Sequence, residues 1–486
     1  MPTNHFVQMC KTFQENVKFS ADSPVPSPDG SPFDAAKMSA VVKARQGLLP
    51  ASYRTAYAAP LLATLPDIVG QLKQQLAESE QQGEPADEAM ADAKSLADTL
   101  VGAVRDWGEA AYHQPLTRFE AVVSNLYRSF LSKDQRVNVG PPLIETVPPL
   151  VTFAATADAG PFTLPIDSVK QFTGAAVGVV SLPGAYAAHP LLWPALAHET
   201  GGHDVAHADP GLLDELAAGV TKLDGVSKNL GAIWGAWMDE TAADVYGLLN
   251  VGPSFAVSLA AFFSALEASG SSQQKIGTIG TLLPVSQGQL ADPHPVDLLR
   301  LYVAMGVVGA LEGLSVTTRS AWLAQIDAIA QVAGGGATTI DVFDVGTRKV
   351  IQKLPLPEMA DVAKKVGQFV ATAKLAALGG HAIQDIETWD DPDELAATNI
   401  AAIAATKSIV GLGDDAQLLA GTTIALFQDP TQYLAITSNL NDALDDSFAR
   451  DPIFGSASPQ SALALKRRGR GFSRTPTAPL FPIVMA

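Results

Sequence analysis

Three of the eight histidines of this chain lie in one short segment, residues 197–209 (AHETGGHDVAHAD), with carboxylates between them. Imidazole nitrogens and carboxylate oxygens bind zinc well, and a catalytic zinc site uses three protein ligands and keeps one position open. His198 and His203 are five residues apart, and Glu199 directly follows the first of them. We therefore predict a zinc centre with these two histidines as ligands and Glu199 as the general base that activates water.

The five-residue spacing is one longer than the i,i+4 histidine pair of the common zinc-protease motif. On a regular α-helix, five residues turn about 500°, which leaves the two rings ~140° apart. The rings converge only if the helix takes an extra residue, as in a π-type bulge of the kind found at functional sites. Gly201 and Gly202 stand where that distortion would fall, and glycine tolerates it best. The sequence thus predicts a π-bulge across the histidine pair.

The segment DETAAD, residues 239–244, supplies the remaining groups of the predicted centre. Glu240 and Asp244 are four residues apart, so on a helix they share a face. A carboxylate from a later helix is the usual third ligand when two histidines come from the first, and we assign Glu240 to that role. Asp244 is then expected to accept the other ring N–H of a ligand histidine, which fixes its tautomer and raises its basicity.

The pair HETGGH and DETAAD resembles the HExxGH and D/E-E-x-x-A-D motifs of the dipeptidyl peptidase III family of zinc peptidases. The resemblance implies one zinc ion per chain, with His198, His203 and Glu240 as ligands and Glu199 as the base. Asp239 replaces the more usual glutamate at a position that binds no metal. The match covers residues 198–244, and nothing of that family's other domain is recognisable. More loosely, the plan is similar to the thermolysin-like gluzincins, which favours a peptidase over any narrower activity.

The segment ADPHPVDLLRLY, residues 291–302, offers two further candidates. A His-Pro pair followed by an arginine on the same helix also occurs downstream in several zinc-peptidase groups. His294 could donate to the oxyanion of a tetrahedral intermediate, and we carry it as a candidate catalytic residue. The alternative is a helix start with Asp292 as its N-cap. Arg300 could pair with an acidic residue behind the ligands, but we favour the interpretation that it is only a structural residue of that helix.

Several other interpretations of the cluster stay open at this stage. His203 and His207 form a normally spaced pair with Asp204 as base, but aspartate is one methylene shorter and would reach water less well. A three-histidine site fits poorly, because His207 follows His198 by nine residues instead of ten. The site could also be a metal-stabilised binding module without catalysis. A zinc amidase acting on a small molecule is a further alternative to a peptidase.

Composition limits the range of partners. The formal net charge of −18 argues against broad nucleic-acid binding, because phosphate contacts need clustered Lys and Arg. We expect no membrane span, since the densest apolar run, Phe255 to Leu266, is too short. Cys10 is the only cysteine, and the first twenty residues lack the apolar core of a secretory signal, so we expect a cytoplasmic protein. Secretion by a signal-independent route stays open. One local exception is a basic tail: Lys466, Arg467, Arg468, Arg470 and Arg474.

The expected fold is α+β and mainly α-helical, with a zincin-like centre between helical regions. We place boundaries so that residues 1–140 form a helical N-terminal region, 141–333 the zincin-like catalytic region and 334–486 a C-terminal region. The C-terminal region combines a small strand pair, helices and the basic tail. Apolar periodicity predicts the following elements: helices over 61–132 with a break at 81–86, from 191 through the histidines, and over 233–249, 255–267, 296–313 and 358–378, with strands at TTIDVF and KVIQKLP.

One strand has a predicted function. In zincins an extended peptide pairs with an edge strand that precedes the metal helix. The run AVGVVSL, residues 176–182, is the only strongly β-type segment in the thirty residues before His198. Pro183 would end this strand, and proline is typical of edge strands. We therefore predict that this run borders the metal cleft as a free edge that binds substrate.

Overall fold

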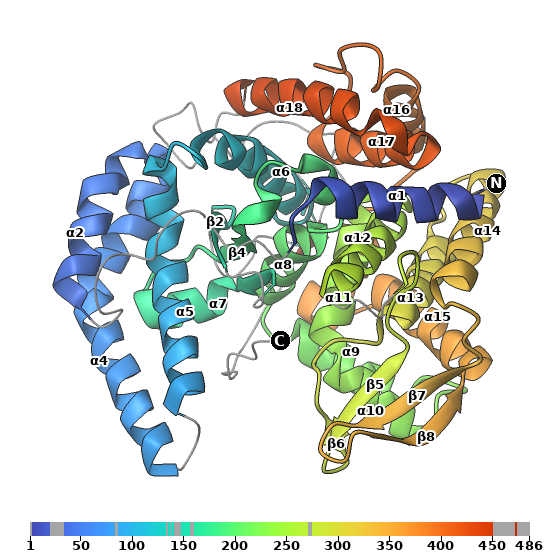
Figure 1. The fold of residues 1–486 in the computed structure, drawn as a ribbon, viewed down its shortest axis with the longest axis horizontal. Coiled ribbons are helices and arrows are strands. Elements are labelled where there is room, and N and C mark those ends of the chain that lie inside the picture. The colour runs from blue at the N-terminus through green and yellow to red at the C-terminus, as the bar shows by residue number, and fades with distance from the viewer. Residues whose placement is uncertain are drawn as a thin grey trace.

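The chain folds mainly into helices, with three small sheets (Figure 1). The computed structural model describes the following residues: 2–19, 34–82, 86–132, 135–136, 138–139, 147–155, 160–270, 275–450 and 472–473. The proline-rich linker at 21–33 and the basic side chains of the predicted tail lie outside these ranges. The expected fold class, α+β and dominated by helix, agrees with this architecture.

The N-terminal part is helical, as predicted from its apolar periodicity. Its helices are α1 (Pro2–Asn16), α2 (Ala35–Arg45), α3 (Ala51–Tyr53), α4 (Ala59–Gln82), α5 (Ala86–Arg105) and α6 (His113–Leu131). Helices α4 and α5 are consecutive antiparallel neighbours, and α6 contacts the segment that holds the three histidines (Figure 1). The middle of the chain contains α7 (Ile166–Thr173), α8 (Asp204–His207), α9 (Leu212–Val220), α10 (Lys228–Ala236), α11 (Met238–Val251) and α12 (Ser254–Gly270).

The remaining helices complete the right-hand and upper parts of the molecule (Figure 1). They are α13 (Asp297–Ala310), α14 (Val316–Ala333), α15 (Leu356–Thr372), α16 (Asp391–Ala401), α17 (Asp415–Gln428) and α18 (Tyr433–Arg450). Helices α12, α13 and α15 match the expected segments to within a few residues. The single helix expected over 233–249 is instead two helices, α10 and α11, which meet at Trp237. Trp234 and Trp237 are both buried in the core.

A four-stranded sheet lies at one end of the molecule, in the order β6-β5-β7-β8. Strands β7 (Thr339–Asp344) and β8 (Lys349–Pro355) form the antiparallel pair expected from TTIDVF and KVIQKLP. Strand β5 (Leu282–Ser286) pairs in parallel with β7, and β6 (Gln289–Leu290) closes the sheet as a short hairpin partner. Two-residue strands β1 (Asn138–Val139) and β9 (Phe472–Ser473) pair in parallel elsewhere.

The three-stranded sheet beside the histidine segment corrects the substrate-strand prediction. Its order is β2-β4-β3, with β2 (Leu150–Ala155) parallel to β4 (Val179–Pro183) and β3 (Phe162–Leu164) antiparallel to it. The predicted edge run forms β4, which is therefore paired on both sides and wholly buried. The prediction that residues 176–182 form a free edge is wrong. Strand β3 pairs only with β4 among the described strands and is the outer strand on that side.

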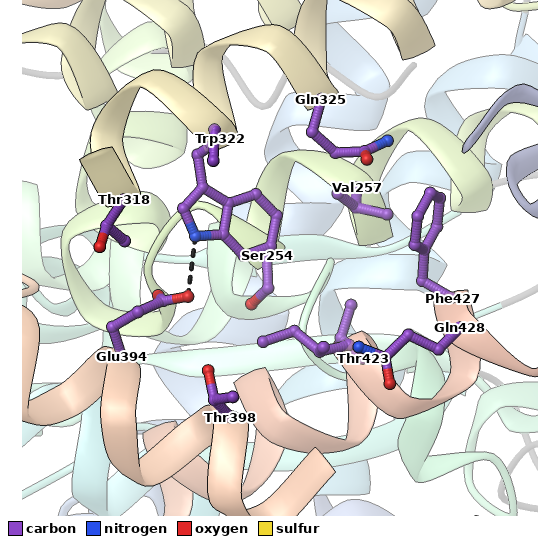
Figure 2. A pocket seen from close by; sticks show the side chains of 12 residues that line it. Ser254, Val257, Thr318, Trp322, Gln325, Glu394, Thr398, Thr423, Phe427 and Gln428 are labelled. Carbon is purple, nitrogen blue, oxygen red and sulfur yellow. Dashed lines mark hydrogen bonds between the residues drawn. The ribbon is translucent and has the colours of Figure 1, made fainter. Parts of the chain in front are cut away.

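Helix α1 packs against helices from the second half of the chain. Its apolar face, which includes Phe6, Met9 and Phe13, is fully buried. It packs against α12, α14 and α17, so the first helix of the chain lies beside helices formed some 250 to 420 residues later (Figure 1). No described helix combines the length and apolar character that a membrane crossing requires. A cavity of about 380 Å³ lies among α12, α14, α16 and α17 (Figure 2).

Candidate metal centre

The predicted π-bulge is present. Residues Glu199–His203 form one π-helical turn, directly followed by α8. A short apolar stretch of turns precedes it, in place of the regular helix expected from residue 191. A Cβ on Gly202 would lie 2.7 Å from the Ala243 Cα atom, and one on Gly201 would lie 2.9 Å from the Asn250 side chain. The two glycines therefore allow the π-helical turn to contact α11 more closely than any other residue would.

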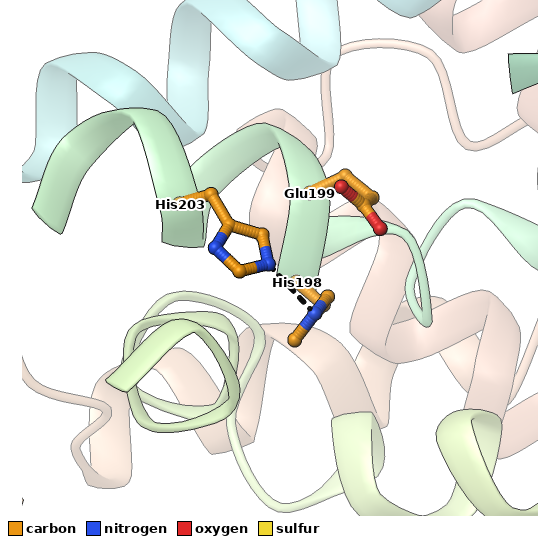
Figure 3. Close-up of side chains that lie close together, drawn as sticks. All are labelled: His198, Glu199 and His203. Carbon is orange, nitrogen blue, oxygen red and sulfur yellow. Dashed lines mark hydrogen bonds between the residues drawn. The ribbon is translucent and has the colours of Figure 1, made fainter. Parts of the chain in front are cut away.

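The extra residue of the turn brings the two histidine rings together (Figure 3). The Nε2 atoms of His198 and His203 are 3.1 Å apart. From α11, Glu240 places Oε2 at 3.0 Å from His198 Nε2 and Oε1 at 3.4 Å from His203 Nε2. Three predicted ligands from two segments thus converge on one point.

The opposite side of each ring faces a carboxylate. His198 Nδ1 is 3.0 Å from Asp244 Oδ1, and His203 Nδ1 is 2.9 Å from Asp239 Oδ1. A carboxylate can only accept, so the Asp239 contact places a proton on His203 Nδ1. His198 Nδ1 lies close both to an acceptor, Asp244, and to a donor, an Nη atom of Arg300 at 3.1 Å. When both rings are neutral and protonated at Nδ1, their Nε2 atoms carry lone pairs and face each other across the gap. Asp244 occupies the position that the sequence predicted for it, and Asp239 supplies the equivalent contact for the second ring.

The electrostatics of the group favour a bound cation. Burial alone would lower the pKa of His203, but the charges of Glu240 and Asp239 outweigh it and raise that pKa well above its usual range. Burial likewise would raise the pKa of Glu240, yet His203 and His198 hold it well below normal. The buried carboxylates are therefore ionised and need positive charge nearby. A metal ion can supply that charge in place of ring protons.

The donor atoms also fit zinc by geometry. Tetrahedral zinc with bonds of about 2.0–2.1 Å separates its ligand atoms by roughly 3.3 Å. The two Nε2 atoms are 3.1 Å apart, and each lies 3.0–3.4 Å from a different oxygen of the Glu240 carboxylate. These separations are close to those that a tetrahedral zinc ion would impose on its ligand atoms.

Glu199 lies on the same turn, and its side chain is almost completely buried. Its Oε2 atom accepts a hydrogen bond of 2.8 Å from the Thr163 hydroxyl on β3. Glu199, His198 and His203 each offer a ligand atom, and these atoms lie within 4.8 Å of one another. Glu199 is thus within reach of the same point as the rings. Thr163 had no signal in the sequence, because the three-residue strand that holds it is too short to show a periodicity.

Arg300, on α13, corrects an expectation. Instead of serving only its own helix, it makes two hydrogen bonds of 2.7 Å to the Asp244 carboxylate, from Nε and from an Nη atom. Both side chains are buried. The Arg300 charge, acting against burial, keeps the pKa of Asp244 below its ordinary value. The result is a fixed series of contacts from Arg300 through Asp244 to the His198 ring.

His294 reaches the edge of the site from the loop before α13. Its Nε2 atom is 3.5 Å from Glu240 Oε1, and its side chain is 32% exposed. Asp292 does not cap a helix, because α13 begins only at Asp297 with Val296 before it. Asp292 Oδ1 instead accepts from the backbone N–H of His294 at 2.9 Å and contacts its Nδ1 at 2.7 Å. These contacts fix the ring with Nε2 toward Glu240.

His207, the alternative ligand, faces other partners. Its Nε2 atom is 3.0 Å from Asp239 Oδ2, and its Nδ1 atom is 3.2 Å from Asp167 Oδ2 on α7. Burial would lower the pKa of His207, but these two carboxylates raise it to about 10. Asp204, the base in that alternative, is fully buried and accepts from the backbone N–H of Ile166. His203 Nε2 therefore faces His198 and Glu240, and His207 faces other partners.

Comparison of the chain with protein-family models, with curated proteins and with solved structures finds no match in any of the three. The function of this chain is therefore inferred from the chemistry of the site.

Proposed function

We propose that this chain is a zinc-dependent hydrolase and that its substrates are peptides. The observation that supports the proposal most directly is the close approach of the two imidazole Nε2 atoms to each other and to the Glu240 carboxylate. Both histidines direct Nδ1 at a carboxylate and Nε2 at Glu240 and at each other. Under this proposal His198, His203 and Glu240 are the three protein ligands, which leaves one position for water or substrate.

Zinc bound there would polarise a carbonyl group and lower the pKa of water toward ~7. Glu199 then takes a proton at its carboxylate and later passes it to the leaving amine. Thr163 holds one carboxylate oxygen of Glu199 in place by donating to it. His294 is fixed by Asp292 at the more exposed side of the site, where it can donate to a developing oxyanion.

A non-catalytic metal site is the second candidate, and one observation favours it. The carboxylate of Glu199 lies within ligand reach of both histidines. If Glu199 binds the metal together with His198, His203 and Glu240, four protein ligands close the site. Closed four-ligand zinc sites are structural. The role of Glu199 therefore separates a hydrolase from a metal-stabilised binding protein.

The test is the variant Glu199→Gln, which keeps the size of the side chain and removes its basicity. We expect purified wild type and variant to contain about one zinc each by inductively coupled plasma mass spectrometry. Cleavage of an unbiased peptide library should fall by about 10²–10⁴-fold in the variant. Loss of zinc together with activity would identify Glu199 as a ligand. Metal-dependent cleavage of small amides without cleavage of any peptide would instead favour an amidase.

A further inference from the structure

The cavity among α12, α14, α16 and α17 shares no residue with the metal centre (Figure 2). Its volume of about 380 Å³ falls within the range of small-molecule sites, roughly 300–1,000 Å³. Ser254, Val257 and Thr423 form its buried floor, whereas Thr398 and Gln428 are exposed at its rim. The cavity therefore has an inside and an entrance, as a ligand site requires.

A single carboxylate sets the charge of the cavity. Glu394 accepts a hydrogen bond of 2.9 Å from each of two indoles, Trp322 to Oε1 and Trp389 to Oε2. An ionised carboxylate offers about four acceptor positions, so these two bonds orient Glu394 without saturating it. Glu394 is the only charged residue that lines the cavity. The ring of Trp322 and the side chain of Phe427 provide aromatic walls beside it (Figure 2).

We propose that this cavity binds a small organic ammonium ion with an aromatic body. The ammonium group pairs with Glu394, and the aromatic rings favour a cation and a flat apolar body. Because no lining residue is basic, an anion of the same shape is rejected. This site would operate independently of the metal centre.

Isothermal titration calorimetry on the full chain tests the proposal with two probes of matched shape, tryptamine and indole-3-propionate. We expect tryptamine to bind and indole-3-propionate to bind at least tenfold more weakly. Glu394→Gln should weaken tryptamine binding roughly tenfold or more, because it removes a charged hydrogen-bond acceptor. Glu358→Gln, on the exposed surface of α15, is the matched control and should leave the affinity unchanged.

A second variant protects the test from misfolding, since Glu394 also holds two tryptophans. Phe427→Leu removes one aromatic wall of the cavity, and the Phe427 side chain takes part in no hydrogen bond. We expect it to fold normally and to lose roughly three- to tenfold in tryptamine affinity. Equal binding of both probes, unchanged affinity in Phe427→Leu, or no tryptamine binding at millimolar concentration would each overturn the proposal. So would loss of binding in Glu199→Gln, because that would place tryptamine at the metal centre.

Discussion

Arg300 and Asp244 illustrate how a buried pair can act on a neighbouring ring. Removal of either partner leaves the other charge buried without compensation, which is much more costly than loss of an exposed pair. Asp244 has a second task, because it accepts from His198 Nδ1. Arg300 therefore orients the carboxylate that in turn contacts the His198 ring. A substitution of Arg300, which lies on another helix, would thus also disturb the position of His198.

The first prediction concerns Asp244→Asn. The amide keeps the shape of the side chain but weakens both the Arg300 pair and the acceptor for His198. We expect zinc affinity to fall about 10–100-fold, measured by competition with a chromophoric chelator. Asp445→Asn is the control, since Asp445 also pairs with an arginine, Arg118, but is partly exposed. An unchanged affinity in Asp244→Asn would contradict the assigned role.

The second prediction separates the two possible sets of ligands. Glu240→Gln should lower zinc content sharply from about one ion per chain, because a carboxamide is a poorer zinc ligand than a carboxylate. His207→Ala should keep the metal, because its ring contacts Asp239 and Asp167 and no predicted ligand. Metal analysis of both purified variants provides the measurement. Loss of zinc in His207→Ala with retention in Glu240→Gln would reverse the assignment.

At this scale the meeting of the two motifs could be predicted, and contacts made by residues outside them could not. His198, Glu199 and His203 share one turn, and Glu240 and Asp244 share one helix face, so their types and spacing were informative. The partner of Asp244 is 56 residues away on α13. Nothing in a helical pattern specifies which buried carboxylate an arginine meets. The role expected for Arg300 was wrong for that reason.

Among the secondary-structure elements, the π-helical turn depends on the absence of a side chain at Gly202. A methyl group there would lie 2.7–2.8 Å from three atoms of Ala243, two of them in the backbone of α11. Backbone atoms cannot move aside as a flexible side chain does. The separation of the histidines from Glu240 is therefore set by how closely two helices approach.

The third prediction follows from this contact. Gly202→Ala should destabilise the protein by about 1–3 kcal/mol, the range for overpacked cores, and should also reduce zinc content. Gly70→Ala is the matched control, because Gly70 is exposed inside α4 and a Cβ there meets nothing within 4 Å. That control should stabilise the helix by up to ~1 kcal/mol. Urea denaturation followed by circular dichroism measures both changes. Equal stability of the two variants would exclude a steric role for Gly202.

Strand order was harder to predict than strand position. The β-branched run before the histidines does form a strand, but its neighbours decide whether it is an edge. Strand β3 has three residues, too few to show alternation, and its antiparallel pairing with β4 spans the whole of α7. A local pattern carries no information on such a partner. The free edge was therefore assigned to the wrong strand.

For the molecule as a whole, the docking of α1 determines the chemistry of Cys10. This residue lies on the buried face of α1, and burial raises the pKa of its thiol to about 12. The raised value means that the thiol stays protonated at pH 8, where a free cysteine already forms thiolate. Reactivity at Cys10 is thus a measure of whether α1 remains in place.

The fourth prediction uses this property. At pH 8 the folded protein should react with a thiol-specific disulfide reagent far more slowly than the same protein in guanidinium chloride. One thiol per chain should appear on denaturation. The rate in native buffer reports opening of α1, and Phe13→Ala, which leaves a cavity beneath the helix, should increase it. Rapid stoichiometric labelling of the native wild type would show that α1 is not docked.

The position of α1 also has a consequence for synthesis on the ribosome. Helix α1 is translated before all the helices that cover it, and one of these, α17, ends at Gln428. At about 5–20 residues per second, roughly 20–80 s pass before that surface exists. For this interval Phe6, Met9 and Phe13 have no complete binding site on their own chain. During that interval the apolar face of α1 is open to contacts with other chains and with chaperones.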